Sequence, residues 1–312
     1  MHAPLDKCPI CTSDRIVALW NARDTQEVNW RYDRCSNCGD IFLNPPLEDA
    51  EVEQVYGEDY YGPDHNRFGG NVETTLKIFR NARANRAEKL MPPGGSVLDV
   101  GCGRGVFLEI LARRGYKVTG TEISETAGKD AAKRVEVKVG ELENIGFTRE
   151  SFDLVTFWQV LEHLPDPKGA VAEASRLVKP GGKMLIQVPN PESIQARLGR
   201  DKWFHLDPPR HMHLMPLKCV DMVAAETGFT RVKHTTLNLE FSPFGILQTF
   251  QNLMGIKRDK LYETMMASKK EAGQTVLTAV SALLAPVAGF LSLLEWSVGA
   301  GGVIEAVYVK EG

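Results

Sequence analysis

A short apolar stretch that runs into closely spaced glycines decides the fold: Val97-Leu98-Asp99-Val100-Gly101-Cys102-Gly103-Arg104-Gly105. The apolar half is typical of a buried strand, and the glycines predict a tight turn at the start of a helix. Glycines at such a turn let the backbone approach a ligand closely, with the helix N–H groups pointing at it. The stretch therefore predicts a strand, loop and helix that bind a nucleotide-like ligand.

From residue 96 onward, apolar runs alternate with helical patterns, which is typical of a parallel sheet covered by helices on both faces. Strands are expected at 96–100, 117–122, 135–139, 152–157, 183–188, 230–239 and 303–309. Helices are expected at 72–91, 105–114, 124–132, 168–178 and 216–227. The sequence thus predicts an α/β protein with a seven-stranded, Rossmann-like sheet.

The composition is that of an ordinary globular protein. Of 312 residues, 43% are hydrophobic and 25% are charged, and the formal net charge is −3. This balance provides no overall positive surface, so a nucleic-acid partner is not expected. No apolar segment precedes Cys8, which argues against a secretory signal peptide and predicts a cytoplasmic protein.

Two C-x-x-C pairs near the N-terminus predict a metal site. Cys8 and Cys11 form the first pair, and Cys35 and Cys38 form the second. Paired thiols in a reducing compartment are typical metal ligands, and four thiolates form a closed, structural Zn²⁺ site. We therefore divide the chain into a zinc-ribbon module (1–45), a linker with N-terminal helices (46–95, including an acidic helix over 48–61) and a main domain (96–312). Chelation is expected to unfold the zinc-ribbon module while ligand binding by the main domain persists.

The glycine loop and the segments after it resemble a known family. The G-x-G-x-G loop after an apolar-Asp-apolar strand is similar to motif I of class I S-adenosylmethionine-dependent methyltransferases. Residues 152–167, 177–182 and 188–190 resemble small-molecule methyltransferases related to quinone-biosynthesis enzymes. Residues 8–61 resemble a module found on bacterial methyltransferases of glycan and deoxysugar pathways. The resemblance implies S-adenosylmethionine as cofactor.

Candidate cofactor residues follow from the loop and from this resemblance. Glu122 ends the second strand, about 20 positions after the glycines, where an acidic side chain can accept hydrogen bonds from ribose hydroxyls. The resemblance assigns the adenine amino group to Glu141 and the ring to the residue after it. The candidate cofactor-binding residues are Asp99, Gly101, Cys102, Gly103, Gly105, Glu122, Ile123, Glu141, Leu142 and Gln159.

Histidines are the candidate catalytic bases if the acceptor is a hydroxyl, because imidazole titrates near neutral pH. His163 follows the fourth strand, at the sheet edge where ligands bind in open α/β folds. Residues 203–213 follow the fifth strand and combine aromatic residues with three more candidates: His205, His211 and His213.

The segment 240–302 lies between the last two predicted strands. No charged residue occurs from Thr275 to Leu294, and Pro286 interrupts this stretch. Three interpretations stay open: a helical cap over the active site, a hairpin lying on the membrane surface, and a transmembrane span. A hairpin lying on the membrane surface would place the protein peripherally at the inner face of the membrane.

The predicted function is methyl transfer to oxygen or carbon of a small molecule, a sugar or glycan, or a lipid-like acceptor. An NAD-dependent oxidoreductase is one alternative, although Val106 occupies the position of the third glycine of a dinucleotide loop. A zinc-ribbon nucleic-acid adaptor is another, although acidic residues offset the arginines around the cysteines.

Overall fold

The computed structural model describes residues 3–48, 51–52, 55, 70–258, 260–266 and 272–311. Most of the predicted acidic helix over 48–61 lies outside these residues. The central element is a mixed sheet in the order β10-β11-β8-β7-β4-β5-β6. Its strands are β4 (Ser96–Val100), β5 (Lys117–Glu122), β6 (Glu136–Val139), β7 (Phe152–Trp158), β8 (Val178–Pro189), β10 (Phe229–Thr235) and β11 (Val303–Lys310). The predicted seven-stranded α/β sheet is confirmed.

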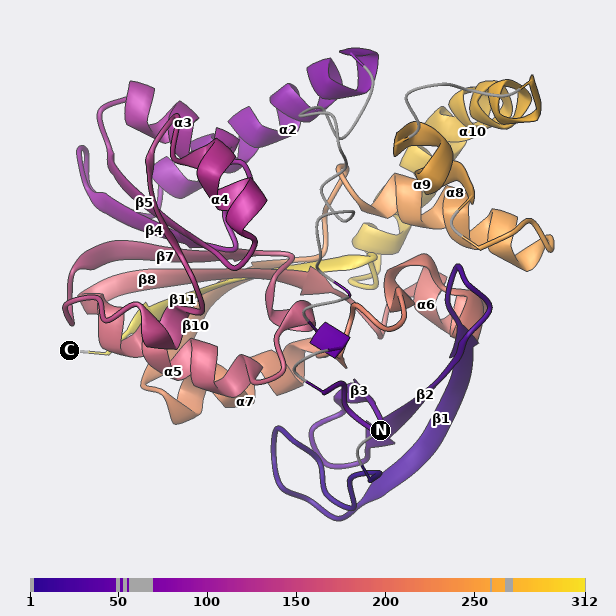
Figure 1. Cartoon of the computed structure of the whole chain (residues 1–312), viewed down its shortest axis with the longest axis horizontal. Helices are drawn as coiled ribbons and strands as arrows, with labels where there is room; N and C mark the ends of the chain where they lie inside the picture. The colour runs from indigo at the N-terminus through magenta and orange to yellow at the C-terminus, as the bar shows by residue number, and fades with distance from the viewer. Residues whose placement is uncertain are drawn as a thin grey trace.

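Five strands run parallel, and β11 pairs antiparallel with both β8 and β10. Helices α2 (Gly70–Glu88), α3 (Val106–Arg113) and α4 (Glu125–Ala131) lie on one side of the sheet, and α5 (Pro167–Leu177) and α7 (Leu217–Glu226) on the other (Figure 1). Neighbouring residues of β4 point to opposite faces, as period-two alternation requires: Val97 packs with Ala84 and Leu108, and Leu98 packs with Val171 and Val220.

The N-terminal segment forms a second, four-stranded antiparallel sheet of β1 (Ile16–Arg23), β2 (Asn29–Cys35), β3 (Ile41–Leu43) and β9 (His213–Leu214). The fourth strand comes from the main domain, where Phe42 pairs with His213 and Ile41 with Leu214. Strand β9 was not predicted, because a strand of two residues has no recognisable periodicity.

The N-terminal sheet shares its hydrophobic contacts with the main domain. Cys35, Cys38 and Phe42 belong to the same buried cluster as Val220 and Phe229. A second cluster joins Tyr32 and Leu43 to Trp203, Leu206 and Leu214. The segments 1–45 and 96–312 therefore differ in sequence pattern, but their buried side chains belong to shared hydrophobic clusters.

The inserted segment is helical. It contains α8 (Ser242–Leu253), α9 (Lys260–Met266) and α10 (Ala272–Ser297), which pack through Leu247, Leu261 and Ala288, near α6 (Ile194–Gly199) (Figure 1). Helix α10 continues through Pro286 instead of ending there. Among the described residues, one helical stretch is long and apolar enough to span a bilayer: Val276–Ser297, with a mean hydropathy of 2.1 and 17% of that window buried.

Candidate active site

One cavity of about 710 Å³ lies along the carboxyl ends of β4, β5, β6 and β7. This volume is within the usual range for small-molecule sites. The glycine loop and the ends of β5 and β6 line one half. The other half is lined by the turn after β7, the segment after β8, and helices α2, α8 and α9. The cavity therefore has room for two ligands side by side.

The glycine loop shapes the first half. Gly101 and Gly103 have φ angles of 66° and 54°, which favour glycine. A Cβ on Gly101 would meet Val160 Cγ2 at 2.8 Å, whereas a Cβ on Gly103 would meet nothing within 4 Å. Gly101 thus permits close packing of the loop, and Gly103 presents open backbone to the cavity.

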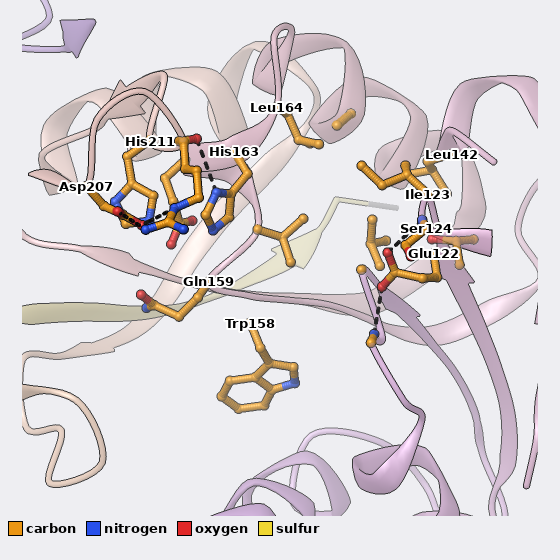
Figure 2. A pocket seen from close by; sticks show the side chains of 18 of the residues that line it. Glu122, Ile123, Ser124, Leu142, Trp158, Gln159, His163, Leu164, Asp207 and His211 are labelled. Atoms are coloured by element: carbon orange, nitrogen blue, oxygen red, sulfur yellow. Dashed lines mark hydrogen bonds and ion pairs between the residues drawn. The ribbon is translucent and has the colours of Figure 1, made fainter. Parts of the chain in front are cut away.

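Glu122 is held rigidly beside this loop. Gly103 N donates to Glu122 Oε2 at 2.8 Å, and Ser124 N donates to Glu122 Oε1 at 3.0 Å (Figure 2). The side chain is buried and lines the cavity. Each carboxylate oxygen can accept a second hydrogen bond, so Glu122 presents a fixed acceptor pair for two adjacent hydroxyls.

Seven of the ten predicted cofactor residues line the cavity: Gly101, Gly103, Glu122, Ile123, Glu141, Leu142 and Gln159. The other three lie beneath it. Cys102 packs against Gly120, and Gly105 begins α3 with a left-handed conformation against Val135.

Asp99 is the third residue below the cavity, and it accepts a 2.6 Å hydrogen bond from Thr156 Oγ1. Burial raises the pKa of Asp99 to about 7, against the smaller opposing effect of the Thr156 hydrogen bond. Asp99 is therefore buried against β7 and does not line the cavity.

A pair of histidines lies in the second half. His163 is in a 3₁₀ turn (Leu161–His163) directly after β7, and His211 lies in the segment after β8. Their ring centroids are 4.6 Å apart. His163 Nδ1 is 3.2 Å from the backbone oxygen of Arg210, and His211 Nδ1 is 2.7 Å from that of His205 (Figure 2 shows both rings). Because a carbonyl oxygen only accepts, each Nδ1 carries the proton and each Nε2 keeps its lone pair.

Enclosure keeps these rings neutral. Desolvation, with a smaller contribution from the nearby His211, lowers the pKa of His163 to about 3. The same cause lowers the pKa of His205 to about 3 and that of His211 below its usual value. An imidazole with so low a pKa is a weak general base at neutral pH.

The other two predicted histidines have different surroundings. His205 also lines the cavity, but its ring packs between Trp203 and Phe204, and a Cβ on Gly245 of α8 would meet its Nε2 at 2.7 Å. His213 does not line the cavity. It is buried in β9, where its Nδ1 is 2.9 Å from Asp40 Oδ2. The structure therefore brings His163, His205 and His211 to the cavity, but not His213.

The sequence placed Phe204 in the candidate segment 203–213 but did not indicate the rest of the aromatic wall of the second half. Phe204, Phe244 and Tyr262 contact one another, with ring centroids 5.1 to 6.3 Å apart. Arg83 of α2 joins this wall, with its guanidinium 5.2 Å from the Trp158 ring. These residues are far apart in the chain and belong to no motif. The signals in the sequence were the aromatic residues of 203–213 and the apolar character of 240–302.

Arg83 also makes an ion pair across the cavity. Its Nη2 lies 2.7 Å from Glu240 Oε1, at the start of the inserted segment. The pair ties α2 to the segment that leads into α8.

The four N-terminal cysteines form a separate cluster. The Sγ atoms of Cys8 and Cys38 are 3.6 Å apart, those of Cys11 and Cys35 are 3.5 Å apart, and all four lie within 4.8 Å of one another. A tetrahedral zinc ion with bonds of about 2.3 Å holds its sulfurs about 3.8 Å apart. The cluster therefore fits zinc. Four thiolates leave no open position, and none of the four lines the cavity, so the site is structural.

Comparison with curated proteins gives relatives that cover part of the chain. An ubiquinone biosynthesis O-methyltransferase of Alkalilimnicola ehrlichii is 41% identical over 126 residues, covering 37% of this chain and 51% of the relative. The corresponding enzyme of Hahella chejuensis is 36% identical over 111 residues, covering 33% and 47%. The chain spans about half the length of the curated relatives it matches.

Among solved structures, a phosphoethanolamine N-methyltransferase of Haemonchus contortus in complex with S-adenosyl-L-methionine is similar in fold. Its TM-score is 0.51 at 21% identity, covering 85% of this chain and 58% of that one. A geranyl diphosphate C-methyltransferase of Streptomyces coelicolor also has a TM-score of 0.51, at 15% identity, covering 85% and 89%. Both show the fold alone.

A family model described as a methyltransferase domain matches residues 71–234, which is more than half of the chain. The matched region contains the glycine loop, Glu122 and the turn with His163. Together with the strand order, this match favours the methyltransferase prediction over the dinucleotide oxidoreductase, and the chain belongs to the methyltransferase domain family.

Proposed function

We propose that this protein transfers a methyl group from S-adenosylmethionine to a hydroxyl oxygen of a small, apolar acceptor. The observation that carries the proposal is that one cavity joins the Glu122–glycine-loop half to the histidine and aromatic half. The curated relatives support oxygen as the methylated atom, since they are named O-methyltransferases.

In the first half, Glu122 would accept hydrogen bonds from the two ribose hydroxyls, and Gly103 would pack against the cofactor. Glu141 and Leu142, at the carboxyl end of β6, would contact the adenine. The cofactor supplies an electrophilic methyl group on a sulfonium. The protein's main task is then to align the acceptor oxygen with it, and positioning of this kind contributes on the order of 7–11 kcal/mol.

In the second half, Phe204, Phe244 and Tyr262 would enclose an apolar acceptor. His163 and His211 would face its reacting oxygen. A sugar or glycan acceptor is less favoured, because the wall of α8 and α9 presents rings with few hydrogen-bonding groups. This wall favours a lipid-like acceptor.

We also propose that the insertion 240–302 is a cap over the cavity and that this cap contacts a membrane. Leu283, Val287 and Phe290 of α10 are exposed apolar residues, and so are Phe250 of α8 and Met254 directly after it. Exposed apolar surface of this extent is typical of protein or membrane contacts. Because α8 also lines the cavity, a bilayer against this surface would bring a lipid-like acceptor close to the site. This arrangement supports a peripheral location at the inner membrane face over a transmembrane span, because β11 returns to the sheet directly after α10.

Calorimetric titration with S-adenosylhomocysteine tests the cofactor assignment. Glu122→Ala should weaken binding by at least about tenfold, since a charged hydrogen-bond acceptor is worth about 1.5–3 kcal/mol. Glu125→Ala is the matched control: Glu125 is exposed, pairs with Lys129 and lies outside the cavity. If Glu122→Ala binds like wild type, or if NAD binds and S-adenosylhomocysteine does not, the proposal fails. Incubation with labelled methyl donor and fractionated extracts would then identify the acceptor.

A further inference from the structure

Gln159 follows β7 directly and has a backbone conformation that few side chains adopt. Its φ angle is 56°, in the left-handed region that favours glycine. The backbone is fixed there, because Gln159 N donates to Gln187 O at 2.8 Å. Residues held in such a conformation cluster at ligand sites, where the surrounding structure offsets the strain. The conformation therefore points to a use for the Gln159 side chain that glycine could not provide.

The carboxamide of Gln159 has a hydrogen-bond donor with no partner in the protein. Its Nε2 is buried and donates to none of the residues that the structure describes, although Gln159 lines the cavity. Leaving a buried donor unpaired is costly, and such groups are normally satisfied in folded proteins. The donor therefore points to an oxygen that a ligand brings into the cavity.

The direction of the side chain favours the acceptor over the cofactor as this ligand. In Figure 2 the Gln159 side chain extends towards the side of Asp207 and away from Glu122. Gln159 also belongs to the same connection after β7 as His163, which lies in the second half of the cavity. The sequence predicted a cofactor contact for Gln159 from its place after a parallel strand, and that place alone does not distinguish the two halves.

We propose that Gln159 is a specificity-determining residue, which donates a hydrogen bond from Nε2 to an oxygen of the acceptor. This role rests on the proposed function and deepens it, because it defines the acceptor class: an apolar body that packs against the aromatic wall and presents a hydroxyl or carbonyl oxygen to Gln159. A site built to hydrogen-bond an oxygen rejects an analogue that lacks it, because the donor then stays buried and unpaired. Purely hydrocarbon ligands should therefore bind weakly, although the wall is apolar.

Equilibrium dialysis of 2-naphthol and of naphthalene against the full-length, zinc-loaded protein tests this role without any turnover. The two probes share one apolar body and differ in a single oxygen. Wild type should bind 2-naphthol about fivefold or more tightly than naphthalene, as one added hydrogen bond allows. Gln159→Leu, which keeps most of the side-chain volume but has no polar group, should lose this preference and keep wild-type affinity for S-adenosylhomocysteine.

Asn144→Leu is the matched control. Asn144 is a second carboxamide that lines the cavity, but it lies beside the adenine-side residue Glu141 and already donates to Glu141 Oε2 at 2.7 Å. Its replacement should leave the preference for 2-naphthol unchanged.

Gln159→Gly separates a role in binding from a role in the fold. Glycine adopts the φ angle of 56° without strain, so this variant should melt no lower than wild type while losing the preference for 2-naphthol. A melting temperature below that of wild type would show that Gln159 is kept for the fold and would overturn its role in specificity.

The inference is also overturned if wild type does not bind 2-naphthol more tightly than naphthalene, or if Gln159→Leu keeps the preference. Weaker S-adenosylhomocysteine binding by Gln159→Leu with the preference intact would place Gln159 in the cofactor half instead. The wild-type comparison stands even if a variant fails to fold. Failure of the proposed function is distinguishable, since the probes are measured with and without S-adenosylhomocysteine and that failure would appear as absence of S-adenosylhomocysteine binding to wild type.

Discussion

The imidazole of His213 and the carboxylate of Asp40 form a hydrogen bond of 2.9 Å between two buried side chains. Asp40 lies two residues after the zinc-ligand candidate Cys38, and His213 lies two residues after His211. The contact therefore links the metal-binding segment directly to the segment that lines the acceptor half of the cavity.

His213→Ala should destabilise the protein through this contact. Removing one partner of a buried hydrogen bond leaves the other unsatisfied, which costs about 1–3 kcal/mol. Denaturant unfolding measures the effect. His234→Ala is the control, because His234 is exposed on β10 and its side chain contacts that of Arg231, three residues away. Unfolding of His213→Ala at the wild-type denaturant midpoint would show that the contact contributes little.

Loss of the four-cysteine zinc site should affect the whole chain. The sequence alone predicts that ligand binding survives chelation, but Cys35 and Cys38 share a hydrophobic cluster with Val220 and Phe229 of the main domain. We therefore expect Cys35→Ser to lower the melting temperature of the entire protein and to weaken S-adenosylhomocysteine binding. A cofactor affinity equal to that of wild type would restore the expectation of independent modules.

Asp99 should make stability fall as pH rises. Burial raises its pKa to about 7 in the folded protein, against about 3.9 for an unperturbed aspartate. The folded state therefore binds this proton more tightly, and the free energy of unfolding should decrease between about pH 4 and about pH 7 and then level off.

The variant Asp99→Asn has no carboxyl group at this position, so it lacks this pH dependence. The difference in unfolding free energy between wild type and Asp99→Asn should shrink over the same interval by a few kcal/mol. Urea titrations at a series of pH values check this. Parallel pH profiles of the two proteins would contradict the assigned pKa.

The apolar cap surface should bind vesicles. Leu283 is 78% exposed and Phe290 60% exposed, so Leu283→Asp combined with Phe290→Asp should not disturb the core. We expect the double variant to lose most of its co-sedimentation with anionic phospholipid vesicles. Val17→Asp is the control, since Val17 is 52% exposed on the distant β1. Equal sedimentation of all three proteins would exclude a membrane role for this surface.

The strands and helices of the main sheet could be predicted from the sequence because each carries its own pattern. The predicted strand 117–122 matches β5, and the predicted helix 105–114 matches α3 within a residue at each end. Glu122 could be placed at the cavity because it ends a parallel strand next to the glycine loop, and that position follows from topology.

The acceptor half depends on contacts between distant segments, and no local pattern records them. Arg83 meets Glu240 across 157 positions of the chain. His211 and His213 are only two residues apart, yet one lines the cavity and the other completes the N-terminal sheet. The sequence spacing could identify both histidines as candidates, but it could not show which of them lines the cavity.

Strand β9 limits how this protein can be truncated or recombined with homologues. Its two residues complete the N-terminal sheet, and the same stretch of chain carries His211. A recombinant enzyme that begins at residue 70 would leave Trp203, Leu206 and Leu214 uncovered, and aggregation would follow. If the N-terminal segment with the four cysteines were exchanged between homologues, the loop after β8 would have to be exchanged with it. The two segments are therefore expected to be inherited together.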